Sequence, residues 1–184
     1  MLVVDPLSFS IGMNGLGELQ HFFSALAHGI SRIDIAFVLA VMAFNILVAR
    51  FGMWPYSLVT FPGNAGHELM HWFVAKLFFA QPAFPSLWPR RDGDRWIMGS
   101  VAFAPSILNA IPVALAPLLL LPLGVMFVSN FMHPATGWTY IFCGWVAGNM
   151  LFAALPSGQD WKIAAPSIMV FGLLGCAYYA AVRF

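Results

Sequence analysis

Apolar residues gather into about five long segments along the chain, separated by short polar stretches. These segments cover residues 35–49, 58–80, 99–128, 138–155 and 163–182. A helix needs about 20 apolar residues to cross a bilayer. The pattern therefore predicts an all-α, polytopic membrane protein with about five transmembrane helices.

Polar and proline-rich stretches refine this picture. The third segment contains four prolines, at positions 105, 112, 117 and 122, so we expect it to be kinked or broken. Residues 81–98 contain the turn signal Asp92-Gly93 between Trp88 and Trp96, which predicts a short hairpin at the membrane surface with both tryptophans at headgroup depth. Residues 156–162 form a polar break between the last two segments.

The N-terminal part has a different pattern. Residues 16–30 place apolar side chains at helical spacing, with Glu18, His21 and His28 among them, which is typical of an amphipathic helix at the interface. We therefore divide the chain into an interfacial segment, residues 1–33, and a transmembrane domain, residues 34–184.

Composition supports a lipid-facing surface. The chain of 184 residues is 61% hydrophobic and 8% charged, with a mean hydropathy of +0.83, whereas soluble domains contain about 25% charged residues. A net charge of +1 offers no basic face for nucleic acid. Cys143 and Cys176 both lie in apolar runs and indicate neither a disulfide framework nor a thiolate metal site.

The basic residues predict an orientation. With five spans, most of them lie on one side of the membrane: Arg32, Arg90, Arg91, Arg95 and Lys162. The positive-inside rule then places the N-terminus and the loops 81–98 and 156–162 in the cytoplasm. We expect a multi-pass protein of a bacterial-type inner membrane.

Candidate chemistry lies in the second apolar segment. His67 and His71 are four residues apart, so a helix places both imidazoles on one face, where they can bind one Zn²⁺. Glu68 lies next to the first ligand and can act as the general base toward a water molecule. Asn64 is a candidate N-cap of this helix. Ionisable residues in an apolar helix are costly unless they have partners, which favours a functional site.

A catalytic zinc needs a third protein ligand, and elimination points to Asp160. Asp160 lies in the polar break at residues 156–162, where unwound backbone is tolerated if it lines a polar cavity. Capping of the following helix and a salt bridge with Lys162 remain alternative roles for Asp160. The other carboxylates have simpler explanations as terminal, interfacial or surface charges, including a salt bridge between Asp34 and Arg32: Asp5, Glu18, Asp34, Asp92 and Asp94.

These motifs, in this order, resemble those of the site-2 protease family of intramembrane zinc metalloproteases. The matching stretches are residues 66–71 (Gly-His-Glu-Leu-Met-His), residues 103–109, and residues 149–160. The resemblance implies a core of three transmembrane helices with a membrane-associated hairpin, over roughly residues 58–165. It also implies that the first motif supplies two ligands and the base, and that the last motif supplies an aspartate ligand.

Some positions depart from the family pattern. The chain has Gln159-Asp160-Trp161 where members usually have Leu-Asp-Gly, and Ala104-Pro105 where they usually have Gly-Pro. No inserted PDZ or other regulatory domain is present. The resemblance is therefore to a divergent, minimal member.

Two further polar residues have open roles. Asn149 lies inside an apolar segment, and family members have an asparagine in this region that is thought to line the substrate cleft. We predict that Asn149 binds a substrate strand or the oxyanion, and a hydrogen bond between packed helices is the equal alternative. His133 is expected to be solvated in an outer loop.

The sequence thus predicts an intramembrane zinc metalloendopeptidase that hydrolyses peptide bonds in transmembrane segments of other proteins. Two other function classes stay open. A catalytically inactive membrane chaperone or assembly factor of the same fold would not need Glu68. A metal or proton transporter should have a polar path on both sides of the histidines, whereas one face of this chain is nearly uncharged.

Overall fold

The computed structural model describes residues 29–93 and 95–183, and this part of the chain is mostly helical. Its elements are α2 (Arg32–Val48), a 3₁₀ turn (Ala49–Phe51), α3 (Met53–Val59), α4 (Phe61–Leu77), β1 (Arg90–Asp92), β2 (Arg95–Ile97), α5 (Ala110–Ala114), a 3₁₀ turn (Ala116–Leu119), α6 (Leu120–Phe127), a π-helical turn (Val128–Met132), α7 (Gly137–Phe152) and α8 (Gly158–Arg183). The predicted amphipathic helix at residues 16–30, with Glu18, His21 and His28, lies almost entirely outside the described residues.

Two helical stretches among the described residues are long and apolar enough to cross a membrane. Arg32–Phe51 has 20 residues and a mean hydropathy of 2.0, and Gly158–Arg183 has 26 residues and a mean hydropathy of 1.6. The stretch Ala116–Met132 is apolar but shorter. The predicted number of five spans is therefore not confirmed. At 17 and 16 residues, α4 and α7 are shorter than the length of about 20 residues that crosses a bilayer without help.

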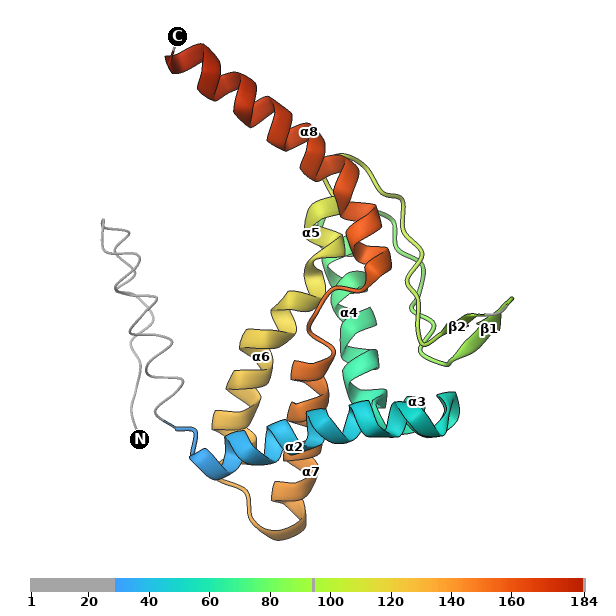
Figure 1. The fold of residues 1–184 in the computed structure, drawn as a ribbon, viewed down its shortest axis with the longest axis vertical. Helices are drawn as coiled ribbons and strands as arrows, with labels where there is room; N and C mark the ends of the chain where they lie inside the picture. Colours follow the sequence, from blue (N-terminus) through green and yellow to red (C-terminus); the bar gives the residue numbers. More distant parts are fainter. Residues whose placement is uncertain (1–28, 94, 184) are drawn as a thin grey trace.

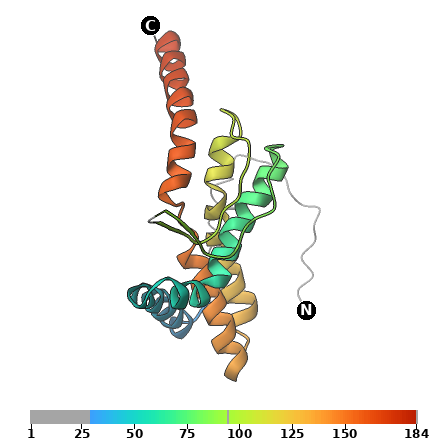
Figure 2. The ribbon, with the colours of Figure 1, turned by 90° about the vertical axis from the view of Figure 1, so that its right-hand side faces the viewer.

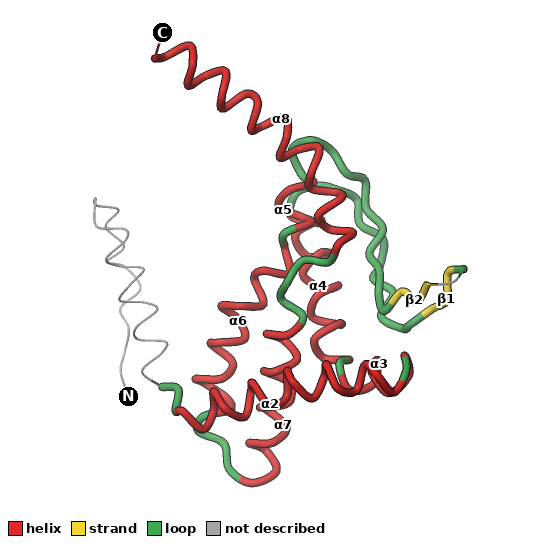
Figure 3. The backbone as a smooth tube through the Cα atoms, viewed as in Figure 1, coloured by secondary structure: helices red, strands yellow, loops and turns green. Residues whose placement is uncertain are grey.

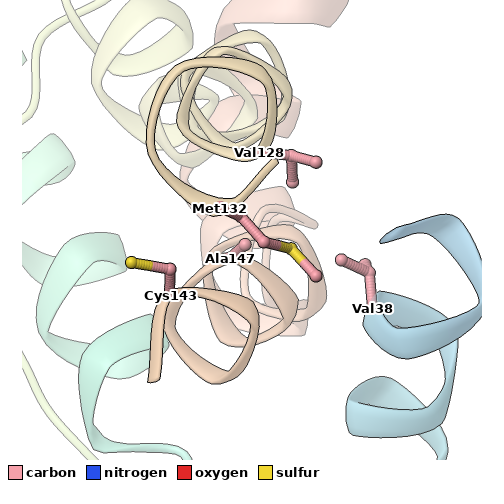
Figure 4. Packing of buried hydrophobic residues seen from close by; sticks show 5 residues of the cluster. All are labelled: Val38, Val128, Met132, Cys143 and Ala147. Atoms are coloured by element: carbon pink, nitrogen blue, oxygen red, sulfur yellow. The ribbon is translucent and has the colours of Figure 1, made fainter. Parts of the chain in front are cut away.

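Helices α4, α6 and α7 form the centre of the molecule. Helix α2, which continues into α3, crosses α7 in the lower part of the view, and the start of α7 reaches below it (Figure 1). The side view shows α2 and α3 to one side of α7 (Figure 2). Gly144 and Gly148 of α7 allow the approach of α2, because a Cβ at either position would overlap Phe37 or Val41. A cluster of buried side chains packs around α7, with Val38 on the α2 side and Cys143 on the opposite side (Figure 4): Val38, Val128, Met132, Cys143 and Ala147.

The proline-rich third segment is broken, as predicted. Residues 99–109 are not helical, and residues 110–132 form a succession of short α, 3₁₀ and π turns. Val113 and Ala116 of this region pack against Val74 and Ala75 of α4 in a second buried cluster. The third segment thus covers one side of α4 without forming one continuous helix.

The predicted hairpin is present between α4 and α5 (Figure 3). Strands β1 and β2 are antiparallel, with Arg91 opposite Trp96. Between these strands and the helices the two arms stay paired, because Ser86 and Ser100 exchange two backbone hydrogen bonds of 2.9 Å. The arm that includes residues 99–103 is therefore extended.

The second half of α8 extends away from the other helices in both ribbon views (Figures 1 and 2). Its large apolar side chains are exposed, for example Leu173 at 70% and Leu174 at 61%.

Asp34 has a different partner from the one predicted. Asp34 is 2% exposed and forms a capping box with Ser31 at the start of α2. Its ion-pair partner is His133, with 2.7 Å between Oδ2 and Nδ1, rather than Arg32. Tyr140 also donates a hydrogen bond of 2.9 Å to this carboxylate. The predicted Arg32 salt bridge is wrong, because folding brings the loop before α7 against the first turn of α2. The His133 side chain is 47% exposed, as expected for a solvated residue, but it also pairs with Asp34.

Candidate metal centre

Helix α4 carries both predicted histidine ligands and the predicted base. It begins at Phe61, with Pro62 in its first turn, where a missing backbone N–H leaves no hydrogen bond unmade. The expected N-cap is wrong, because Asn64 lies inside the helix and donates a side-chain hydrogen bond of 2.8 Å to the Thr60 hydroxyl. The Thr60 hydroxyl in turn donates to the carbonyl of Tyr56, so these polar groups connect α3 to α4.

Asp160 lies in the first turn of α8, directly after the non-helical residues 153–157. Its Oδ2 accepts a hydrogen bond of 2.6 Å from the Ser157 backbone N–H, and its own N–H donates to the Ser157 hydroxyl at 3.3 Å. The capping role considered for Asp160 is therefore present. This cap also holds the carboxylate in one orientation, with the side chain 9% exposed.

That orientation brings Asp160 against both histidines, as predicted. Oδ1 lies 3.2 Å from His71 Nε2, and Oδ2 lies 3.4 Å from His67 Nε2. The two Nε2 atoms are 3.1 Å apart. Among the described residues, the potential ligand atoms of His67, His71 and Asp160 all lie within 4.8 Å of one another.

Backbone carbonyls orient the two imidazoles. His67 Nδ1 lies 2.8 Å from the carbonyl oxygen of Ala153, at the end of α7. His71 Nδ1 lies 2.7 Å from the carbonyl oxygen of Val113, in α5. A carbonyl oxygen only accepts hydrogen bonds, so each Nδ1 carries the hydrogen and each neutral ring presents the lone pair of Nε2. Histidine ligands of metals typically have this second contact.

The donor set fits a zinc ion. Two Nε2 lone pairs and a carboxylate are all acceptors, so their close approach is unfavourable unless a cation or additional protons lie between them. Bonds of about 2.0–2.1 Å to a tetrahedral zinc would separate neighbouring ligand atoms by about 3.3 Å. The observed separations of 3.1, 3.2 and 3.4 Å lie close to this value. Two nitrogens and one oxygen also match the ligand types of catalytic zinc sites.

Glu68 lies beside the three candidate ligands but is not itself a candidate ligand. Its carboxylate has no hydrogen-bond partner among the described residues, and it contacts Gly99 so closely that a Cβ there would lie 2.7 Å from Glu68 Cγ and 3.0 Å from Oε1. Glu68 thus faces the extended arm of the hairpin. A free carboxylate next to a candidate metal can accept a proton.

A cavity of about 730 Å³ joins these groups. Its walls include the three candidate ligands, Glu68, the hairpin arm from Trp96 to Val101, and Gln159 beside Asp160. Because Ser100 directs its N–H and C=O toward Ser86, the N–H and C=O groups of Gly99 and Val101 point to the other edge of the strand. Gly99 and Val101 both line the cavity, so a free strand edge lies along it.

Asn149 lies outside this cavity. It is fully buried in α7, where its Oδ1 accepts a hydrogen bond of 3.1 Å from Asn45 of α2. This placement matches the alternative interpretation, a hydrogen bond between packed helices. The predicted contact of Asn149 with substrate stays a prediction.

Sequence reasoning missed several groups that support the site. The carbonyls of Ala153 and Val113 belong to residues whose side chains carry no chemistry, so no motif marks them. Asn45 was also missed, although an amide within a run of apolar residues is a signal that could have drawn attention to it.

Comparisons of the chain with protein-family models, with curated proteins and with solved structures gave no match. The interpretation of the site therefore depends on its geometry and on the sequence motifs.

Proposed function

We propose that this protein is an intramembrane zinc metalloprotease related to the site-2 proteases, with His67, His71 and Asp160 as ligands and Glu68 as the general base. The observation that carries the proposal is the convergence of three acceptor groups at 3.1–3.4 Å beside a free carboxylate. Asp160 lies 89 positions after His71 in the sequence. The convergence of the three groups therefore does not follow from the spacing of the histidines on one helix alone.

The chain's own residues account for binding and proton transfer. A bound zinc would act as a Lewis acid and lower the pKa of a water molecule to about 7. Glu68 accepts a proton from the attacking water and passes it to the leaving amine. The carbonyls of Ala153 and Val113 keep both imidazoles in the tautomer that binds a cation.

The substrate segment would lie in the cavity of about 730 Å³. A peptide bond within a helix is shielded by its own backbone, so the segment must be extended before attack. The free edge at Gly99 and Val101 offers backbone hydrogen bonds to such a segment beside Glu68. This would hold the scissile bond within reach of the base.

The surface supports a membrane location. Large apolar side chains are exposed on several helices, including Phe44 at 50%, Phe73 at 57% and Phe142 at 59%. Soluble monomers rarely expose apolar patches of more than a few hundred Å². The proposal therefore includes a multi-pass topology, in which shorter helices such as α4 and α7 are embedded together with the two longer ones. The N-terminus and the hairpin lie on the cytoplasmic side, as the positive-inside rule favours.

Glu68 argues against an inactive relative that only binds transmembrane helices. A partly buried carboxylate without a hydrogen-bond partner costs free energy, and a binding function gives no reason to keep it. A base beside the metal does give a reason.

The test is cleavage of a model transmembrane substrate by the reconstituted protein. Glu68→Gln preserves size and packing but removes the proton acceptor, so we expect retained zinc and cleavage lower by about 10²–10⁴-fold. A metal chelator should abolish cleavage by the wild type, and added zinc should restore it. Normal cleavage by the Gln variant would exclude the mechanism.

A further inference from the structure

Helix α2 contains one amide, Asn45, that is fully buried among apolar residues. Its Nδ2 donates a hydrogen bond of 3.1 Å to Asn149 Oδ1 in α7. Its Oδ1 is the buried side-chain atom that has no hydrogen-bond partner within the described part of the chain. Asn45 therefore contributes little net stability, because the free-energy cost of its unpaired buried oxygen is about as large as the gain from its one hydrogen bond. Stability alone does not explain this residue.

Asn149 stands one helical turn before the residue that orients His67. Its backbone carbonyl accepts the N–H of Ala153 at 3.0 Å, and its Nδ2 donates to the carbonyl of Trp145 at 2.9 Å. The carbonyl of Ala153 then lies 2.8 Å from His67 Nδ1. A short chain of hydrogen bonds therefore runs from Asn45 through the last turn of α7 to the first candidate ligand.

The same point is where α4 and α7 meet. Gly63 of α4 packs directly on the Asn149 carbonyl, because a Cβ there would overlap it. The Trp145 indole also donates a hydrogen bond of 2.9 Å to the Val59 carbonyl, before α4 begins. A small shift of α7 along α2 would thus move the Ala153 carbonyl relative to His67.

From this geometry we infer that Asn45 is a positioning residue of the metal centre. Its hydrogen bond to Asn149 sets the register of α7 against α2 and so places the Ala153 carbonyl that orients His67. A single buried amide sets helix register in the same way in other helical assemblies, at some cost in stability. The inference depends on the proposed zinc site, and it adds a residue that contacts neither metal nor substrate.

The test measures zinc affinity and thermal stability of the purified full chain separately. Asn45→Leu should weaken zinc binding about tenfold, at the lower end of the effect of lost outer-shell partners. The unfolding temperature of the metal-free protein should change little, because the variant removes the orphaned Asn45 oxygen and adds buried apolar surface but leaves Asn149 Oδ1 without its donor. Val38→Ala, at the same α2–α7 junction, is the matched control: it should lower the unfolding temperature and leave zinc affinity unchanged.

Asn45→Ala serves if the larger leucine prevents folding, and its zinc affinity should fall below that of Val38→Ala. Equal zinc affinity of the wild type and the Asn45 variants would overturn the inference and leave the zinc site intact. A parallel loss of stability and affinity in both Asn45→Leu and Val38→Ala would overturn it too, since general packing would then explain the effect. Absence of zinc binding by the wild type would instead refute the proposed function.

Discussion

At the scale of single residues, some groups of the site could be predicted from the sequence and others could not. His67, Glu68 and His71 follow one another on one helix, so their spacing alone predicts a shared face. Asp160 was predicted by eliminating the other carboxylates, and the structure brings it to both histidines. The partners of the Nδ1 atoms are backbone carbonyls, which any residue can supply. They depend on where α5 and α7 end in space, and so no residue pattern could reveal them.

Gly99 provides a prediction at this scale. A Cβ at this position would lie 2.7 Å from Glu68 Cγ, so Gly99→Ala should push the carboxylate away from its position. We expect zinc binding to be retained and cleavage to fall by about tenfold or more, as a catalytic group moved by about 1 Å can lose 10²-fold in rate. The measurement is cleavage of the model substrate at equal zinc content.

Gly172→Ala is the matched control for that change. Gly172 lies in α8 with no atom within 4 Å of a Cβ built there, so its substitution should leave cleavage unchanged. Full activity of Gly99→Ala would show that this contact does not position the base.

At the scale of secondary structure, the hairpin and the proline-broken segment followed from the sequence. The turn signal Asp92-Gly93 marks the hairpin, and the prolines in residues 105–122 explain why no long helix forms there. Two boundaries were wrong. The second apolar segment is divided at Thr60 into α3 and α4, and residues 99–109 are not helical although most of them are apolar. A short apolar run has no periodicity that distinguishes a buried helix from an extended strand.

The extended arm leads to a prediction about substrate binding. Val101→Pro removes a backbone N–H from the free edge that lines the cavity, and a proline cannot donate to an added strand. We expect zinc binding to persist while cleavage falls, with most of the loss in KM.

Val101→Ala keeps the N–H and shortens the side chain, so it should cleave the substrate at nearly the wild-type rate. If the proline variant also cleaves normally, substrates do not pair with this edge and the hairpin has another role.

At the scale of the whole molecule, the apolar surface indicates the route by which a substrate would reach the site. The second half of α8 and the outer faces of several helices expose large apolar side chains, and the longest polar connection covers residues 81–98. No part of the described chain forms a separate soluble domain that would bind a folded protein. We therefore propose that the substrate is a single transmembrane helix of another protein that enters sideways through the bilayer.

Lateral entry predicts a dependence on helix stability in the substrate. Unwinding a helix in the membrane exposes backbone groups at a cost of several kcal/mol, so a Gly-Pro pair near the cut should increase cleavage relative to leucines. The comparison uses one reconstituted enzyme and two substrates that differ only at this pair. Equal cleavage of both, or cleavage of soluble peptides alone, would favour a peptidase that acts at the membrane surface.

The zinc content of the purified full-length protein tests the central claim most directly. The account predicts about one zinc ion per chain in the wild type, and loss of that ion in both His67→Ala and Asp160→Ala, because each removes one of three protein ligands. Glu68→Gln should keep the zinc. A wild-type protein without zinc, or variants of His67 and Asp160 that bind zinc as the wild type does, would contradict the account.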